Sequence, residues 1–527
     1  MSPNDTYTSP LAERNASPEM LRLWSARHKF NTWRRIWLAV AEAQHEVTAQ
    51  GGPGASPGSG TPLVTKEQVE DLRAVVDRPG GITDAEIDLA KKYERELRHD
   101  VMAHVHALGD ACPKARPIIH LGMTSQDVVC NADQIVWTES LWMLHDKLLR
   151  LAMVLAHVAR NTATIPTLGF THFQAAQPLT IGRRLIQYCS DVLVCQHRLE
   201  QGLFGEPYEF PRGLRGATGT QASFLSLFDG DTERVDRLES LFVQRLFVRP
   251  STKVETLQAE WHRSGMWKLS GQTYPRVIDT FILSDLASCA AVLHKIATDI
   301  RLLCNRKELD EPFEDKQIGS SAMPYKRNPM RCERICGLCR FVMNLVGNAY
   351  DTAATQWLER TLDDSSNRRL SLPEAFLALD GALDLMHNVA SGLVVHEAMV
   401  RKNLMAELPF MATENILMAC VKLGGDRQAY HERIRVHAQA AGMRVKHEGL
   451  DNDLLDRLKN DKAFWSKARG GPLAAELDWT ESGLMDPMKY IGRSVEQTER
   501  FIKEVVEPLR QQYGEQIAKL GESGPRV

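Results

Sequence analysis

The sequence predicts an all-α protein in which a central bundle of long helices is flanked by two smaller helical regions. Two observations lead to this prediction. Apolar residues recur at helical spacing over several stretches of about 25 to 30 residues. Signals for β-strands are sparse, and residues 245–248 are the main candidate for a strand. With 43% hydrophobic and 25% charged residues, the 527-residue chain has the composition of a globular protein with a sizeable core.

Three apolar stripes predict the bundle helices. They lie within residues 131–160, 278–303 and 372–393, and each repeats an apolar residue every three or four positions, as helices packed along a seam do. A 30-residue helix is about 45 Å long. Such stripes indicate extended packed helices, and they leave open that some seams pair with other subunits. The stripes consist of Trp137, Leu141, Leu144, Leu148, Leu151, Leu155, Val158; Ile278, Ile282, Leu286, Ala290, Leu293, Ile296, Ile300, Leu303; and Leu372, Phe376, Leu379, Leu383, Met386, Ala390, Leu393.

The flanking regions complete the expected domain organisation. We expect an N-terminal helical domain over 1–124, the long-helix bundle over 125–396 and a C-terminal helical domain over 397–527. In the first domain, helices are expected over about 18–50, 66–76 and 84–109. Residues 51–62 are rich in glycine, proline and serine, so they should form a surface loop, to which we assign no function.

Composition and charge exclude several classes of protein. The formal net charge of −3 gives no strong field that would favour nucleic acid or an anionic membrane surface. We expect no membrane span, because no apolar run approaches the roughly 20 residues that one needs, and the first residues lack the features of a secretory signal. Ten scattered cysteines indicate reduced thiols. We therefore expect a cytoplasmic protein with no nucleic-acid or membrane partner.

The stretch 319–329, GSSAMPYKRNP, is an irregular connection between two helical patterns. Pro324 and Pro329 forbid a regular helix or a central strand there, because each lacks a backbone donor and restricts the preceding residue. The stretch nevertheless carries two hydroxyls, a lysine, an arginine and an amide. Loops between rigid elements often carry the chemistry of a protein, so this loop is a candidate functional site.

Two clusters suggest metal binding, and we favour a structural interpretation of both. Cys332, Cys336 and Cys339 match the C-x₃-C-x₂-C spacing of an iron–sulfur site, but the same spacing places them on one face of a helix. His104 and His106 point to different faces of the expected helix, and no HExxH motif occurs. We expect no metal and no cofactor.

Three further polar stretches could carry function. Residues 213–221 are rich in glycine but match neither nucleotide-binding fingerprint, so we interpret them as a tight turn. His172 is expected in a polar loop, and its titration near neutral pH would suit a proton donor if a partner were present. Residues 357–369 place three arginines and two serines in an expected non-helical connector, which could be a solvated charge run or a site for phosphate or carboxylate.

The loop 319–329 resembles the signature loop of the fumarase/aspartase superfamily, whose general form is GSSxMPxKxNP. Its alanine, tyrosine and arginine at the variable positions resemble the adenylosuccinate lyase family within that superfamily. Six other segments are similar to segments of that family in the same order, so the resemblance spans nearly the whole chain. They are LRHDVMAHVH, HLGMTSQDV, TLGFTHFQ, GATGTQASF, GQTYPR and WLERTLDDSSNRR.

The resemblance implies a fold, a reaction and an assembly. It implies β-elimination of fumarate from adenylosuccinate, giving AMP, and from the succinylated carboxamide ribotide SAICAR, giving AICAR, without a cofactor. It also implies a homotetramer whose active sites are shared between chains. The alternatives are another fumarate-releasing lyase, such as an argininosuccinate lyase, an iron–sulfur enzyme built on the three cysteines, or a helical scaffold without catalysis.

The resemblance also implies roles for particular residues. Ser320 would be the base, His172 the acid, Lys326 a neighbour that stabilises the serine alkoxide, and His99 a residue that orients His172 or the phosphate end. The family usually has tyrosine where this chain has Asn15. The residues implied to bind substrate are Arg14, Thr124, Ser125, Gln272, Asn328, Arg334, Arg360, Ser365 and Arg369.

Overall fold

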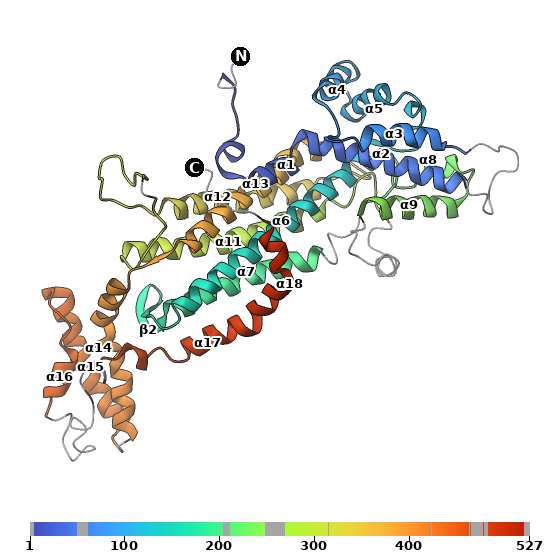
Figure 1. Ribbon diagram of the computed structural model, residues 1–527. Coiled ribbons are helices and arrows are strands. Elements are labelled where there is room, and N and C mark those ends of the chain that lie inside the picture. The colour runs from blue at the N-terminus through green and yellow to red at the C-terminus, as the bar shows by residue number, and fades with distance from the viewer. Residues whose placement is uncertain are drawn as a thin grey trace.

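The computed structural model describes residues 5–49, 62–203, 211–247, 269–314, 316–422, 424–462, 464, 478 and 483–520. The expected loop at 51–62 lies almost wholly outside these residues. The predicted all-α fold is confirmed: long helices form an elongated body, and the described strands make two small antiparallel sheets (Figure 1). The bundle runs along the long axis, with the N-terminal helices at one end and helices α14 to α16 at the other.

The bundle consists of α6 (Ser125–Asn161), α7 (Ile181–Leu203), α11 (Val277–Asn305), α12 (Met330–Ala354) and α13 (Asp363–Ser391). The three predicted apolar stripes lie on α6, α11 and α13, and nearly all their members are buried in one continuous core. The stripes therefore pack against helices of the same chain. The suggestion that some of these seams are left for other subunits is wrong, because the chain's own bundle already buries them.

The N-terminal region contains more breaks than the sequence suggested. The expected helix over 18–50 is divided into α1 (Pro18–Leu23) and α2 (Ala26–Ala49). The expected helix over 84–109 is divided into α4 (Asp84–Leu97) and α5 (Asp100–Ala111), because Arg98 adopts a positive φ of 55°. The helix predicted over 66–76 is confirmed as α3 (Lys66–Val76). A one-turn π-helix, η2 (Leu11–Asn15), precedes α1.

The strands lie where the sequence did not place them. β1 (Pro166–Thr171) and β2 (Gln174–Thr180) form a hairpin with a register shift between Leu168 and Phe170. The expected polar loop around His172 is therefore the tip of this hairpin. The candidate strand at 245–248 is wrong, because α9 (Thr232–Phe247) contains residues 245–247 and residue 248 lies outside the described residues. A second sheet joins β3 (Leu309–Asp310) to β4 (Val394–Val395).

The C-terminal region has a core of its own. Helices α14 (Glu397–Lys422), α15 (Arg427–Met443) and α16 (Leu454–Asn460) pack around a cluster that includes Ile416, Tyr430 and Phe464. The chain then returns along the bundle as α17 (Ser494–Phe501), η8 (Ile502–Val506) and α18 (Glu507–Ala518), and this segment contributes to the bundle core. The proposed domain boundaries at 124 and 396 remain predictions.

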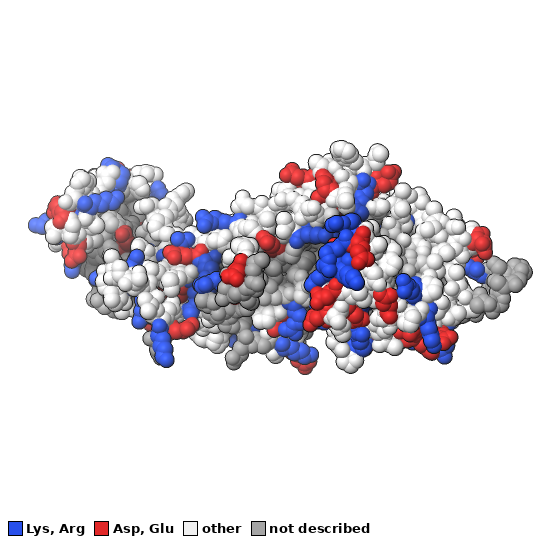
Figure 2. Space-filling model, turned by 90° about the horizontal axis from the view of Figure 1, so that it is seen from above, with Lys and Arg blue, Asp and Glu red and all other residues white. Residues whose placement is uncertain are grey.

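Two surface and composition properties bear on the expected partners. Helices α11 and α14 are long and apolar enough to cross a membrane by length and composition alone, which corrects the expectation that no run approaches that length. Helix α11 is packed among the other bundle helices, as expected for the central helix of a hydrophobic core. Basic and acidic side chains are interspersed over the face shown in Figure 2, so that face presents no extended surface of one sign.

The three cysteines of the C-x₃-C-x₂-C motif lie on one buried face of α12. Cys332, Cys336 and Cys339 are each at most 4% exposed and belong to the bundle core. Burial raises the pKa of the Cys339 thiol to about 12 and that of Cys332 still further. Because thiolates are the metal ligands, this environment favours packed thiols, and the interpretation as a helix face is confirmed.

Candidate active site

The signature loop connects β3 to α12 and is clamped at its base. The carboxylate of Glu311 accepts hydrogen bonds from the backbone N–H groups of Arg331 (3.0 Å) and Cys332 (2.6 Å), which lie in the first turn of α12. The Arg331 guanidinium reaches back to the Glu314 carboxylate at 2.7 Å. These bonds hold the start of the loop next to the start of α12, and residues 321–327 of the irregular stretch are exposed.

Within the loop, Ser320 lies where backbone donors converge on its hydroxyl oxygen. The Oγ atom accepts hydrogen bonds from the N–H groups of Met323 (3.1 Å) and Ala322 (3.4 Å). Such donors would favour an alkoxide over a hydroxyl. Asn328 donates from Nδ2 to the carbonyl of Gly319 at 2.9 Å and so closes the loop. Lys326 is exposed, and among the described contacts its side chain does not reach Ser320.

His172 occupies the tip of the β1–β2 hairpin. Thr171 and Gln174 are paired across the two-residue turn, and His172 and Phe173 both have positive φ, 52° and 54°. Two consecutive positive φ values are typical of the tight turn that matches the twist of a hairpin. The imidazole is exposed, and no described residue makes a side-chain hydrogen bond to it. The hairpin therefore presents His172 outward from its own chain.

At the opposite end of the bundle, Thr124 precedes α6 and Ser125 is its first residue. The Thr124 N–H donates to the Asp127 carboxylate at 2.7 Å. Asp127 is fully buried, and its other oxygen accepts from the N–H groups of Arg215 (2.9 Å) and Gly216 (3.1 Å) and from the Arg212 guanidinium. The glycine-rich stretch 213–221 thus wraps the start of α6, which confirms the predicted tight turn.

Gln272 and Arg360 lie beside this turn. Gln272 donates from Nε2 to the Ala217 carbonyl at 2.9 Å, and its Oε1 accepts from the Arg360 guanidinium at 2.8 Å. Arg360 also lies 3.6 Å from the Asp364 carboxylate. The structure therefore brings Thr124, Gln272 and Arg360 to one end of the bundle through a shared backbone turn.

Ser365 and Arg369 line a cavity of about 340 Å³ between the N-terminal helices and the bundle. Aromatic walls from Trp24, Phe30 and Trp137 surround it, together with Lys29. The expected non-helical connector is corrected here, because α13 begins at Asp363 and both predicted residues lie in its first two turns. An aromatic pocket with cationic side chains at its edge can hold a flat ring and an anionic group.

His99 and Asp100 connect this cavity to α5. His99 is the N-cap of α5, and its Nδ1 accepts from the Met102 N–H at 3.3 Å. Arg369 forms a 2.9 Å ion pair with Asp100. Burial would raise the pKa of Asp100, but the hydrogen bond from the Val101 N–H and the charge of Arg369 outweigh it and lower the pKa.

Arg14 and Arg334 form a separate basic pair. Arg14 lies in η2 and Arg334 in the second turn of α12, close to the base of the signature loop. Burial lowers the pKa of Arg334, and the charge of Arg14 lowers it further. Two neighbouring cations of this kind attract a phosphate or carboxylate group.

The predicted residues divide between the two ends of the bundle. Helix α6 has 37 residues and is about 55 Å long. Thr124 precedes its first turn, whereas the hairpin that bears His172 follows its last turn. The signature loop also belongs to the hairpin end, because it follows α11, whose neighbour Arg306 covers the ring of Phe170 in β1. A single chain therefore does not bring Thr124 and His172 together, nor does it bring His99 to His172.

One residue at the end of the bundle that contains Thr124 was missed by the sequence analysis. His120 begins the HLGMTSQDV segment, has a φ of 69° and accepts at Nδ1 from the Trp37 indole at 3.1 Å. Burial lowers its pKa to about 4; Asp127 opposes that shift and His99 adds to it. The neutral ring must carry its proton on Nε2, so it presents a hydrogen-bond donor. The left-handed backbone next to Thr124 could not be read from the sequence.

Comparisons with known proteins identify the family to which the chain is related. The family description "Adenylosuccinate lyase C-terminus" matches residues 409–501, and the description "Lyase" matches residues 60–222 and 275–344. The chain is 45% identical to adenylosuccinate lyase of Schizosaccharomyces pombe over 95% of each chain. It is 42% identical to that of Saccharomyces cerevisiae, over 98% of this chain and 99% of the relative.

Solved structures of the same fold extend the comparison. The 3-carboxy-cis,cis-muconate lactonizing enzyme of Pseudomonas putida superposes with a TM-score of 0.71 at 22% identity, covering 96% of this chain and 99% of that one. A fumarate lyase of Mesorhizobium sp. BNC1 superposes with a TM-score of 0.70 at 20% identity, over 95% of this chain and all of the other. These structures establish the shared fold, and the sequence relatives establish the family. The chain is a lyase that belongs to the adenylosuccinate lyase family.

Proposed function

We propose that this chain cleaves adenylosuccinate to AMP and fumarate, and SAICAR to AICAR and fumarate, in purine nucleotide biosynthesis. The observation that carries the proposal is the signature loop. The chain is 45% identical to an adenylosuccinate lyase over 95% of both sequences. The first serine of its signature loop, Ser320, accepts two backbone hydrogen bonds. No cofactor is needed for this reaction, because acid–base chemistry alone can eliminate an amine from a carbon acid.

In the proposed reaction, Ser320 removes the proton from the succinyl carbon next to a carboxylate. The N–H groups of Ala322 and Met323 stabilise the alkoxide, and Lys326 approaches once the substrate carboxylates are bound. His172 protonates the departing nitrogen, since an imidazole can give up a proton near neutral pH. The C–N bond breaks as the electron pair left on carbon forms the double bond of fumarate.

The remaining predicted residues bind the charged groups of the substrate. Removal of the carbon-bound proton moves negative charge onto carboxylate oxygens, where Thr124, Ser125 and Asn328 donate hydrogen bonds. Each such donor contributes on the order of 3 kcal/mol by analogy with oxyanion holes. We assign the other substrate contacts, to the phosphate and carboxylates, to Gln272, His99, Arg14, Arg334, Arg360, Ser365 and Arg369.

A cytoplasmic homotetramer with shared active sites would bring residues from the two ends of the bundle into one active site. In an assembly of antiparallel bundles, the His172 hairpin of one chain and the signature loop of a second can meet the Thr124 end of a third. Exposed apolar side chains beside Arg360 support such contacts: Trp357 is 75% exposed, Leu358 97% and Leu362 71%. Surfaces of this kind usually mark protein–protein contacts.

The test is a fumarate-release assay on purified, metal-free protein with adenylosuccinate, SAICAR and argininosuccinate in parallel. We expect turnover of the first two substrates and none of the third. Ser320→Ala should abolish turnover while the protein remains folded and assembled by light scattering. Turnover of argininosuccinate alone, or full activity of Ser320→Ala, would overturn the substrate or the role of Ser320.

A further inference from the structure

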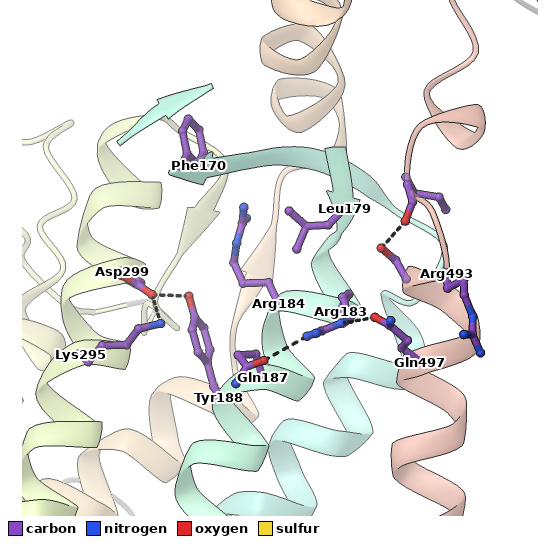
Figure 3. A pocket seen from close by; sticks show the side chains of 12 residues that line it. Phe170, Leu179, Arg183, Arg184, Gln187, Tyr188, Lys295, Asp299, Arg493 and Gln497 are labelled. Atoms are coloured by element: carbon purple, nitrogen blue, oxygen red, sulfur yellow. Dashed lines mark hydrogen bonds and ion pairs between the residues drawn. The ribbon is translucent and has the colours of Figure 1, made fainter. Parts of the chain in front are cut away.

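A second cavity, of about 420 Å³, lies at the base of the His172 hairpin and contains none of the predicted active-site residues. The hairpin forms its upper wall, α7 and α11 its sides, and the start of α17 closes it (Figure 3). The residues that line it are Phe170, Leu179, Arg183, Arg184, Gln187, Tyr188, Lys295, Asp299, Ile491, Arg493, Ser494 and Gln497.

Positive charge dominates this cavity. Asp299, its one acidic lining residue among those described, accepts from both Lys295 (2.6 Å) and Tyr188 (2.9 Å). Arg183 bonds only neutral amides in the described contacts, Gln497 at 2.8 Å and Gln187 at 3.3 Å. A fourth cation, Arg493, pairs with Glu496 outside the cavity lining.

Of the cations that line the cavity, Arg184 has the fewest partners for its charge. Its Nη2 donates to the Leu168 carbonyl, while its buried Nη1 has no hydrogen-bond partner. Within the described part of the chain, no carboxylate forms an ion pair with it. Figure 3 shows its guanidinium extending between Phe170 and Leu179. Burial lowers the pKa of Arg184, and Arg306 adds to that shift although Tyr188, Glu308 and Asp299 oppose it.

A buried cation that forms no direct ion pair is costly, because the protein interior replaces its hydration poorly and carboxylates farther away, here Glu308 and Asp299, compensate only in part. An anion in the adjoining cavity would supply a direct partner, and Arg183, Lys295 and Arg184 approach it from two helices. We propose that this cavity binds a small oxyanion, the phosphate or carboxylate group of a metabolite, at a site separate from the active site. Its volume admits a ligand up to the size of a sugar phosphate.

The position of Arg184 gives this site a route to the active site. Arg184 holds the Leu168 carbonyl at the register shift of β1, four residues before His172. A ligand that engages Arg184 therefore acts on the strand that presents His172. This coupling rests on the proposed role of His172 as the acid, whereas the binding site itself does not.

The binding test uses inorganic phosphate, titrated into the full-length protein by calorimetry at constant ionic strength. The background is Arg334→Gln, which weakens phosphate binding at the proposed active site. We expect one remaining event per chain that Arg184→Gln abolishes and Lys295→Gln weakens at least tenfold. The matched control is Arg500→Gln, two turns along α17 from Arg493 and likewise in an exposed pair, which should leave binding unchanged. Absence of the event, or an unchanged affinity in Lys295→Gln, would overturn the site.

Two further measurements complete the test. Because Arg184→Gln also removes the bond to Leu168, Lys295→Gln decides the outcome if the first variant does not fold. Succinate replaces phosphate in a parallel titration: binding of either anion through Lys295 supports the oxyanion site, and binding of neither overturns it. For the coupling, phosphate should change kcat at least twofold in the wild type but not in Lys295→Gln. An effect of phosphate on KM alone would contradict the coupling and leave the assigned reaction unaffected.

Discussion

The two ends of the bundle present their predicted site residues in opposite ways. At the end of the bundle where α6 begins, Gln272 bonds both to Arg360 and to the turn that surrounds buried Asp127. At the hairpin end, Ser320 and His172 lie on projecting turns, and only Ser320 makes local hydrogen bonds among the described residues. One end is fixed within its own chain, and the other faces outward.

The difference reflects two requirements: residues that bind charge must be held in position, whereas residues supplied to another chain must be exposed. Groups that bind charge gain from being held in place before the ligand arrives, because ordering them costs no free energy at binding. A proton donor supplied to another chain must instead be exposed in its own chain. The arrangement therefore explains how a site can be complete in an assembly while a single chain shows only its parts.

The largest expected effect tests whether Ser320 and His172 of one active site come from different chains. Ser320→Ala and His172→Gln should each lower kcat by about 10²- to 10⁴-fold, the contribution of a positioned acid or base. If the two groups of one active site come from different chains, mixing the two dissociated variants and reassembling them should restore part of the activity. The measurement is fumarate release before and after mixing.

Reassembly of each variant alone provides the control for this experiment. Neither should recover, because every site then lacks the same group. Failure of the mixture to recover, with both proteins reassembled by light scattering, would mean that Ser320 and His172 of a site come from one chain.

The next largest effect probes the fixed end. Asp127→Asn keeps the shape of the side chain but removes the charge that pairs with buried Arg212. We expect the free energy of unfolding to fall by about 3–5 kcal/mol, as when one partner of a buried pair is lost. Denaturant unfolding measures this change. Asp88→Asn, which breaks an exposed 2.9 Å pair with Lys91, should cost less than about 1 kcal/mol; an equal loss would contradict the special role of Asp127.

The bundle and the signature loop were predictable because their signals are local. Heptad-spaced apolar residues bury one face of a helix wherever it packs, and the prolines of 319–329 exclude regular structure by themselves. The hairpin was not predictable, because neither strand alternates regularly between buried and exposed residues and its turn, His172-Phe173, lacks the glycine or asparagine that usually marks such turns. Its conformation follows from packing against α7 and α14.

The same reasoning explains the other misses. The break at Arg98 was hidden because arginine favours helices, and the positive φ there follows from the His99 cap that starts α5. His120 depends on Trp37, 83 residues earlier in the chain. Contacts between distant segments leave no spacing pattern that a single sequence reveals.

A third prediction concerns pH and the N-terminal helices beside the fixed end. His104 stacks on Phe30 with ring centroids 3.8 Å apart, and burial, then Arg34 and Lys29, lower its pKa to about 4. The unfolded chain binds a proton near pH 6.5, so it holds more protons than the folded chain between pH 6.5 and 4. Stability should therefore fall as the pH falls through that window, by at most about 3 kcal/mol from this group.

His104→Phe should remove this part of the pH dependence. Thermal unfolding measured at pH 7 and pH 4.5 should show a smaller difference in the variant than in the wild type. His157→Phe, at an exposed position on α6, serves as the matched control and should leave the difference unchanged. A pH dependence unaltered in His104→Phe would mean that His104 titrates normally in the folded chain.

The smallest expected effect tests the outward-facing end. A Cβ added at Gly319 would collide with the Lys326 carbonyl, so Gly319→Ala must open the loop that Asn328 closes. Since the clamp formed by Glu311 lies outside this stretch, the free energy of unfolding should change by less than about 1 kcal/mol. The loop should nevertheless misplace Ser320, and we expect kcat to fall about tenfold, or about 1.4 kcal/mol in the barrier. Gly337→Ala, where a Cβ meets open space on α12, should leave both quantities near wild type. Equal kcat in the two variants would show that the close approach at Gly319 does not position Ser320. The signature loop would then no longer support the contrast between the fixed end and the outward-facing end of the bundle.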